Sequence, residues 1–276
     1  MKTKVNGISI DYRDEGSGLP VIFIHAFPLN QKMWADQVAA LSNRCRTITL
    51  DLRGFGNSDA PPGPYSMDHM AADVRGLLSL LNIDQAVIVG LSMGGYIALA
   101  FYRNYPDAVR AMVLADTRAS ADTHEARRRR INSAEKAEKE GSRAIAADMV
   151  PLLLGHTTIE TRPSIVERVR EMIHANSPEG IAAAQRGMSI RRDSTYILPG
   201  IDAPVLIIVG SEDELTPPEE AESLRSGITG ARLRVVANAG HLSNLEQPDH
   251  FNSELIDFIG SLEQVGSEAD LSGRVP

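Results

Sequence analysis

The chain has 276 residues, of which 43% are hydrophobic, so it is long enough to bury a large core as one domain with an insertion. Its 36 acidic and 28 basic residues give a formal net charge of -8 at pH 7, which disfavours nucleic acid and anionic membrane surfaces as partners. The single cysteine, Cys45, excludes an internal disulfide and a cysteine-rich metal site.

The N-terminal segment, MKTKVNGISIDYRDEG, alternates apolar and polar residues as an antiparallel edge strand does. It carries charge from its start and has no apolar stretch long enough for a signal peptide or a membrane-spanning helix. We therefore expect a cytoplasmic protein.

Short runs rich in β-branched residues recur along the chain and are separated by helical patterns. These runs lie at residues 21–25, 47–51, 86–91, 109–116, 204–210 and 233–237. One intervening pattern places apolar residues three and four apart from Met67 to Leu81, with Ser66 as its expected cap. Such alternation predicts an α/β fold: a mostly parallel central sheet flanked by helices, with an antiparallel strand at one edge.

The strand signal disappears between residues 117 and 199, where charge-rich helical segments take over. One of them begins at Ser177, because proline at the first helical position, Pro178, loses no hydrogen bond. The sequence therefore predicts an α/β core formed by residues 1–116 and 200–263, with an inserted helical lid at 117–199. Residues 264–276 are small, polar and aperiodic, and are predicted to form a C-terminal tail without a catalytic role.

The motif GLSMG, from Gly90 to Gly94, follows a predicted strand and opens a predicted helix. A serine on such a tight turn has a strained backbone, and the flanking glycines leave room for neighbouring chain. The helix start adds free N–H groups and a positive dipole end. This context predicts Ser92 as a nucleophile.

A serine hydroxyl needs a base within hydrogen-bond reach. Among the seven histidines, His241 lies in a glycine-rich turn, NAGHLSN, between the last predicted strand and the last helix, and is the predicted base. His25 ends another strand and is the alternative, although we expect it to hydrogen-bond loop backbone instead. The remaining histidines lie in helical or linking segments and are predicted to have no catalytic role: His69, His124, His156, His174 and His250.

The base needs a carboxylate to orient it. Asp213 follows the strand VLIIVG in the turn GSEDELTPP, at the sheet edge where ligands gather. Asp116 ends the preceding strand and is the competing candidate, although it is expected to accept hydrogen bonds from turn N–H groups. The order Ser92, Asp213, His241 is the nucleophile, acid, base order of one large hydrolase fold.

A tetrahedral oxyanion needs two N–H donors, each contributing on the order of 3 kcal/mol to the barrier. By position, the backbone of Met93 supplies one of them. The backbone of Phe27, in the loop HAFPLN, is the candidate for the other, since Pro28 has no N–H.

Apolar residues near these positions are candidate pocket walls, and each could equally be ordinary core. They are Phe27, Trp34, Met93, Leu215 and Leu242, together with Met149 and Leu153 of the lid. The run Arg127 to Arg130 has two interpretations: it contacts an acidic substrate, or it forms a solvated helix face, which acidic residues downstream favour.

Five blocks resemble the α/β-hydrolase superfamily along nearly the whole chain. They are VIFIHAFP, DLRGFGNSD, GLSMGGYIALA, GSEDELTP and GHLSNLEQP. The versions found here are most similar to lid-bearing carboxylesterases, 3-oxoadipate enol-lactonases and cofactor-free haloperoxidase-like esterases. The resemblance implies an acyl-enzyme on Ser92, with His241 as general base and Asp213 orienting it. It also implies an oxyanion hole at Phe27 and Met93, and no metal or cofactor.

Two positions limit this resemblance. Ala26 stands where many relatives have glycine, which restricts the backbone of the oxyanion loop. Ser92 stands where haloalkane dehalogenases and epoxide hydrolases need aspartate, which argues against both activities.

The expected function is a carboxylesterase for small or medium acyl chains. A lactonase of the 3-oxoadipate enol-lactonase type is the alternative, and a slow-turnover ligand receptor is a third. The expected partner is a small-molecule ester or lactone, with no nucleic acid and no membrane. The sequence leaves a monomer and a homodimer equally open.

Overall fold

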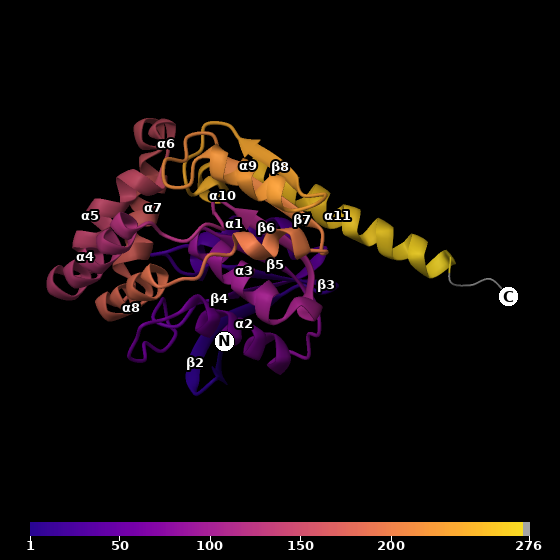
Figure 1. Ribbon diagram of the computed structural model, residues 1–276, viewed down its shortest axis with the longest axis horizontal. Coiled ribbons are helices and arrows are strands. Elements are labelled where there is room, and N and C mark those ends of the chain that lie inside the picture. Colours follow the sequence, from indigo (N-terminus) through magenta and orange to yellow (C-terminus); the bar gives the residue numbers. More distant parts are fainter. Residues whose placement is uncertain (273–276) are drawn as a thin grey trace.

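The computed structural model describes the backbone of residues 1–272 and the side chains of residues 1–262. Its centre is an eight-stranded sheet with the order β1-β2-β4-β3-β5-β6-β7-β8 (Figure 1). The strands are β1 (Lys2–Val5), β2 (Ile8–Glu15), β3 (Leu19–Ile24), β4 (Cys45–Leu50), β5 (Ala86–Leu91), β6 (Val109–Ala115), β7 (Val205–Gly210) and β8 (Arg232–Val236).

The N-terminal strands form the antiparallel edge of this sheet. β2 pairs antiparallel with β1 and β4, whereas every pair from β4 through β3, β5, β6 and β7 to β8 is parallel. The prediction of a mostly parallel sheet with one antiparallel edge is therefore confirmed. β5 and β7 are buried along their whole length, as their uninterrupted apolar sequences require.

Helices cover the sheet and connect its parallel strands. They are α1 (Ala35–Leu41), α2 (Met67–Leu80), α3 (Met93–Asn104), α4 (His124–Glu140), α5 (Ser142–Leu153), α6 (His156–Thr161), α7 (Pro163–His174), α8 (Pro178–Ser189), α9 (Pro218–Gly227), α10 (Ser243–Glu246) and α11 (Pro248–Ser272). Short 3-10 helices are η1 (Gln31–Trp34), η2 (Pro106–Ala108) and η3 (Thr195–Gly200). Helix α3 packs on β3, β5 and β6, which places its first residue at the carboxyl edge of the sheet.

Helices α4 to α8 follow β6 and precede β7, in the stretch predicted as a lid. Figure 1 shows them gathered at one side of the sheet, where α4 packs on α8 and α5 on α7. Ser177 caps α8 by accepting a hydrogen bond from Gly180 N at 2.9 Å. Within residues 1–272, no helix has the length and apolarity needed to cross a membrane.

The C-terminal stretch differs from the irregular tail predicted from residue 264, because α11 continues to Ser272 and extends away from the sheet (Figure 1). Its first half packs through Phe251, Leu255 and Phe258, which are buried. Once a helix is nucleated, each further residue adds a hydrogen bond, so the backbone can stay helical where the side-chain pattern gives no packing signal. Residues 273–276 lie outside the described part of the chain.

Candidate active site

Ser92 occupies the turn between β5 and α3 in a strained conformation. Its φ of 56° and ψ of -114° lie where non-glycine residues are rare, at a cost of about 1–3 kcal/mol. Ser92 N donates to Ala115 O at 2.9 Å, and Thr117 Oγ1 donates to Ser92 O at 2.8 Å. These bonds to the β6 side of the turn hold the serine in place.

The glycines of the motif allow the turn to pack tightly. A Cβ at Gly90 would lie 2.2 Å from Gly94 O, and a Cβ at Gly94 would lie 2.1 Å from Ile24 O. Both obstacles are backbone atoms, which cannot rotate away. Only glycine at these positions lets α3 start directly against β3 and β5.

Ser92, His241 and Asp213 form one hydrogen-bonded chain. His241 Nε2 lies 2.7 Å from Ser92 Oγ, and His241 Nδ1 lies 2.8 Å from Asp213 Oδ2. The side chains of His241 and Asp213 are 3% and 0% exposed, so water does not compete for these bonds. The structure thus brings together three residues that lie far apart in the sequence.

Hydrogen bonds from its own turn fix the Asp213 carboxylate. Its Oδ1 accepts from Leu215 N and Thr216 N at 2.9 Å each, and its Oδ2 accepts from Thr216 Oγ1 at 2.7 Å. Burial by itself raises the pKa of Asp213, but the charge of His241 and these hydrogen bonds outweigh burial and lower that pKa below its usual value. Sequence reasoning missed Thr216, although Asp-x-x-Thr in a turn is a local spacing that could have indicated it.

Asp116, the competing candidate for the acid, forms its hydrogen bonds with groups other than His241. Its carboxylate accepts hydrogen bonds from Gly210 N at 2.8 Å and from Ser243 Oγ. Burial and the nearby negative charge of Asp213 raise the pKa of Asp116 well above its usual value. Asp116 therefore ties β6 to the turn after β7, as its predicted structural role requires.

His25, the competing base, is fully buried and holds the loop after β3. Leu52 N donates to its Nε2 at 3.1 Å, so Nδ1 carries the proton and donates to Ala26 O at 2.9 Å. Burial lowers the pKa of His25, which keeps the imidazole neutral.

The residues of the two predicted oxyanion donors lie next to the Ser92 cavity and next to Ser92 itself. Phe27 lines the cavity that contains Ser92 and His241, and Met93 begins α3 directly after the nucleophile candidate. The hydrogen bonds among the described residues include none from Phe27 N or Met93 N. Both N–H groups are therefore available to a ligand oxygen.

The cavity at Ser92 has a volume of about 410 Å³. Of the predicted walls, Phe27, Leu215, Met149 and Leu153 line it.

Three predicted wall residues do not line this cavity and require correction. Trp34 is fully buried in the core, with its ring 5.1 Å from that of Phe23 and 6.2 Å from that of Phe251. Leu242 is also fully buried and belongs to the hydrophobic core. Met93 is buried as well, and it does not line the cavity.

The opposite wall of the cavity is polar, and sequence reasoning largely missed it. Ala126, Arg129, Arg130 and Ser133 line the cavity at spacings of three and four, so one face of α4 is turned toward Ser92. Arg127, Arg128 and Arg129 are exposed, as the solvated interpretation expects, whereas Arg130 is partly buried and paired with Asp122. The helical spacing could have identified the face that lines the cavity. Other polar wall residues are Arg118, Asp148, Gln185 and Glu214.

A buried glutamate, also missed, anchors the His241 loop. Glu246 Oε1 accepts from Gly240 N at 2.9 Å and from Leu242 N at 3.2 Å, on both sides of His241. Its Oε2 accepts from Gly155 N at 2.8 Å, which ties this loop to the start of α6. Burial raises the pKa of Glu246 despite these bonds.

In the described part of the chain, no three histidine, cysteine, aspartate or glutamate side chains are grouped closely enough to hold a metal ion.

Comparisons with known proteins give consistent relationships. A family model described as alpha/beta hydrolase fold matches residues 20–248. The chain is 32% identical over 232 residues to 3-oxoadipate enol-lactonase 2 of Acinetobacter baylyi, covering 84% of this chain and 85% of that protein.

Two solved structures are similar over nearly the whole chain. A thermophilic esterase from Thermogutta terrifontis, described with malate bound, is 39% identical, with a TM-score of 0.93 and coverage of 95% of this chain and 99% of that one. The enol-lactonase from Burkholderia xenovorans is 32% identical, with a TM-score of 0.88 and coverage of 94% and 100%.

Proposed function

Because the chain belongs to the α/β-hydrolase family, we propose that this hydrolase cleaves carboxylic esters through an acyl-enzyme on Ser92. The observation that carries the proposal is the 2.7 Å contact between Ser92 Oγ and His241 Nε2, at a serine held in strained backbone geometry. A hydroxyl in hydrogen-bond contact with an oriented imidazole is an activated nucleophile.

In the proposed reaction, His241 Nε2 takes the Ser92 proton while Oγ attacks the ester carbonyl carbon. The N–H groups of Phe27 and Met93 stabilise the resulting oxyanion, each by about 3 kcal/mol. His241 then gives the proton to the departing alkoxide, which leaves the acyl-enzyme. A water molecule activated by His241 attacks that ester in turn and releases the acid. Asp213 keeps the imidazole oriented and stabilises its positive charge.

The cavity supports an acyl group of small to medium size. Its volume of about 410 Å³ lies at the lower end of the range for small-molecule sites. Phe27, Met149, Leu153 and Leu215 give one wall an apolar surface suited to an alkyl chain.

A lactone that carries a free carboxylate is the second candidate substrate, and the arginines of the α4 wall favour it. Arg129 is 70% exposed and pairs with Glu125, which is 73% exposed, so this ion pair contributes little and leaves Arg129 available. Asp148 on the same wall is paired with Lys136 at 2.6 Å. The enol-lactonase relatives and the malate-bound esterase are consistent with an acidic substrate.

The test is initial-rate hydrolysis of p-nitrophenyl acetate, butyrate and octanoate, alongside 3-oxoadipate enol-lactone, by the wild type and Ser92→Ala. We expect turnover that depends on chain length and that Ser92→Ala lowers by at least about 10³-fold. Dominant lactone turnover would establish the second candidate. Negligible turnover of every substrate by folded protein would overturn the esterase proposal and favour a ligand receptor.

A further inference from the structure

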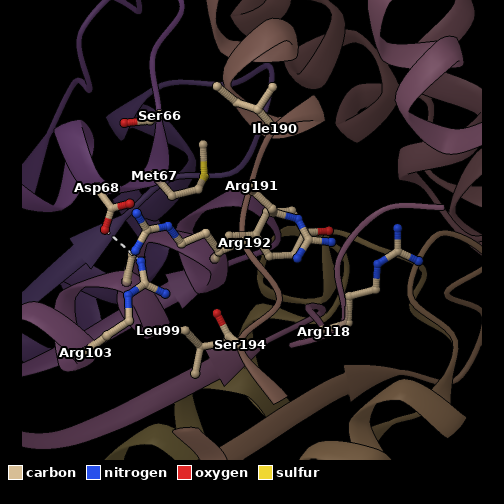
Figure 2. Close-up of a pocket in the computed structure, with 12 residues that line it drawn as sticks. Ser66, Met67, Asp68, Leu99, Arg103, Arg118, Ile190, Arg191, Arg192 and Ser194 are labelled. Atoms are coloured by element: carbon tan, nitrogen blue, oxygen red, sulfur yellow. Dashed lines mark hydrogen bonds and ion pairs between the residues drawn. The ribbon is translucent and has the colours of Figure 1, made fainter. Parts of the chain in front are cut away.

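A second cavity, of about 260 Å³, lies beside the Ser92 cavity (Figure 2). It is formed by α3, by the start of α2 and by the segment that follows α8. Four arginines line it: Arg103, Arg118, Arg191 and Arg192. None of the residues proposed to act in catalysis lines this space.

The arginines that line this cavity outnumber the carboxylates that pair with them. Arg103 pairs with Asp68 at 2.7 Å, whereas Arg118 and Arg191 share Asp122 at 3.3 and 3.0 Å.

Other groups reduce the excess of arginines without removing it. Asp122 is further shared with Arg130, Glu220 lies 3.8 Å from Arg118, and the charge of Arg191 helps to lower the pKa of Asp193. Arg192 is exposed and forms no direct ion pair with the described residues. The cavity therefore has a positive surplus although the chain as a whole is acidic.

Three of the arginines also carry buried donors without an acceptor. The Nε atoms of Arg103, Arg118 and Arg191 have no hydrogen-bond partner among the described residues. The Arg191 side chain is only 3% exposed, so water reaches it poorly. These guanidinium groups therefore have hydrogen-bond donors that the described part of the protein does not satisfy.

The charges are arranged in two groups separated by apolar surface. Arg103 and Arg192 lie near Asp68, as Figure 2 shows, and their positive charges help to lower the pKa of Asp68 although burial raises it. Arg118 and Arg191 form the second group, around Asp122. The apolar side chains of Met67, Leu99 and Ile190 also line the cavity.

We propose that this cavity binds a small linear dicarboxylate, with one carboxylate at Arg103 and Arg192 and the other at Arg118 and Arg191. Guanidinium groups bind carboxylates through paired, charge-assisted hydrogen bonds. The methylene chain of the ligand would pack on Leu99, between the two groups.

An occupant of this cavity would contact the wall of the Ser92 cavity. Tyr96 and Arg118 line both spaces, and the Arg191 guanidinium lies 3.9 Å from the centre of the Tyr96 ring. Binding here is therefore distinct from binding at Ser92, yet adjacent to it, and the test must separate the two.

The test is isothermal titration calorimetry of the full chain with succinate, glutarate and adipate, using butane-1,4-diol as the uncharged control. Arg192→Gln removes one cation of the second cavity and, because Arg192 is exposed and unpaired, is expected to fold normally. Arg129→Gln is the matched control, since it removes the same charge from the Ser92 cavity.

We expect at least one dicarboxylate to bind the wild type. Arg192→Gln should raise the Kd of this ligand by about tenfold or more, whereas Arg129→Gln should change it by less than about twofold. Binding lost in Arg129→Gln but kept in Arg192→Gln would place the anion at Ser92 and overturn the proposal. Absence of binding, or equal binding of the diol, would overturn it as well.

Discussion

Asp116 and Asp213 follow neighbouring strands, β6 and β7, yet their surroundings move their acidities in opposite directions. Burial and the negative charge of Asp213 raise the pKa of Asp116, whereas His241 and turn hydrogen bonds lower the pKa of Asp213 against the effect of burial. A carboxylate that stays ionised 2.8 Å from Nδ1 can stabilise an imidazolium. Only Asp213 meets this requirement.

Replacing Asp213 with asparagine, which has nearly the same side-chain shape but no charge, should therefore abolish most activity. We expect kcat for p-nitrophenyl butyrate to fall by about 10⁴-fold in Asp213→Asn, because the amide no longer holds the required imidazole tautomer. Asp116→Asn is the matched control and should lose less than about tenfold. Steady-state kinetics of both variants measure this difference, and a larger loss in Asp116→Asn would reverse the assignment.

At this scale the sequence predicts the residues whose chemistry is tied to a local pattern. Ser92 and His241 sit in glycine-rich turns at strand ends, and the structure joins them. Thr216 was missed although its Asp-x-x-Thr spacing is a local signal. Glu246 was missed because its role depends on which backbone N–H groups the folded turns bring near it, and a glutamate beside a turn has no unique local signature.

At the scale of elements, the contact between the start of α3 and β3 leaves no space for a side chain at Gly94. In Gly94→Ala, the new Cβ would lie 2.1 Å from Ile24 O, and both chains would have to shift. We expect the free energy of unfolding to fall by about 1–3 kcal/mol, measured by urea denaturation. Activity should fall as well, because the same shift moves Ser92.

Gly260→Ala is the matched control, since it adds the same methyl group to α11, where a Cβ meets no described atom within 4 Å. This variant should gain up to about 1 kcal/mol, the usual advantage of alanine over glycine in a helix. Equal losses in both variants would show that a general helix effect, and not the contact with β3, governs Gly94.

The elements themselves were largely predictable, and the faces of the lid helices were not. Strand ends in the structure lie within two residues of the predicted ends, because alternation and apolar runs define strands well. Helix α4 is mostly polar, so its pattern does not show which side packs, and the solvated interpretation of the basic run fails for Arg130. Arg130 contacts Gln185 of α8, far along the chain, whereas Arg129 stays 70% exposed.

At the scale of the whole molecule, cavities were the least predictable feature. Trp34 and Leu242 are apolar and lie near site residues in sequence, yet both fill the core. The second cavity joins residues of α2, α3 and the segment after α8, whose proximity follows only from the way the inserted helices meet the sheet. Local patterns predict which residues are apolar, and global packing decides which of them border empty space.

Three buried titratable groups link the stability of the molecule to pH. Burial lowers the pKa of His25 and raises those of Asp116 and Glu246. Below the unfolded His pKa of about 6.5, the unfolded chain binds the His25 proton more readily, so this term destabilises the fold as pH falls. The two carboxyl groups act oppositely, stabilising the fold as pH falls through their raised pKa values toward about 4.

The His25 term can be isolated by comparing the wild type with His25→Gln, because both proteins retain Asp116 and Glu246 and their contributions cancel in the difference. Between pH 7.5 and 5.5 we expect the wild type to lose about 1 kcal/mol more unfolding free energy than His25→Gln, the maximum slope being about 1.4 kcal/mol per pH unit. Urea denaturation at both pH values measures this difference, and any structural cost of the variant common to both cancels. His124→Gln removes an exposed imidazole from α4 and should retain the wild-type dependence. If His25→Gln also retained it, the imidazole would be protonated as easily in the folded protein as in the unfolded chain, and its role as a neutral bridge between Leu52 N and Ala26 O would be wrong.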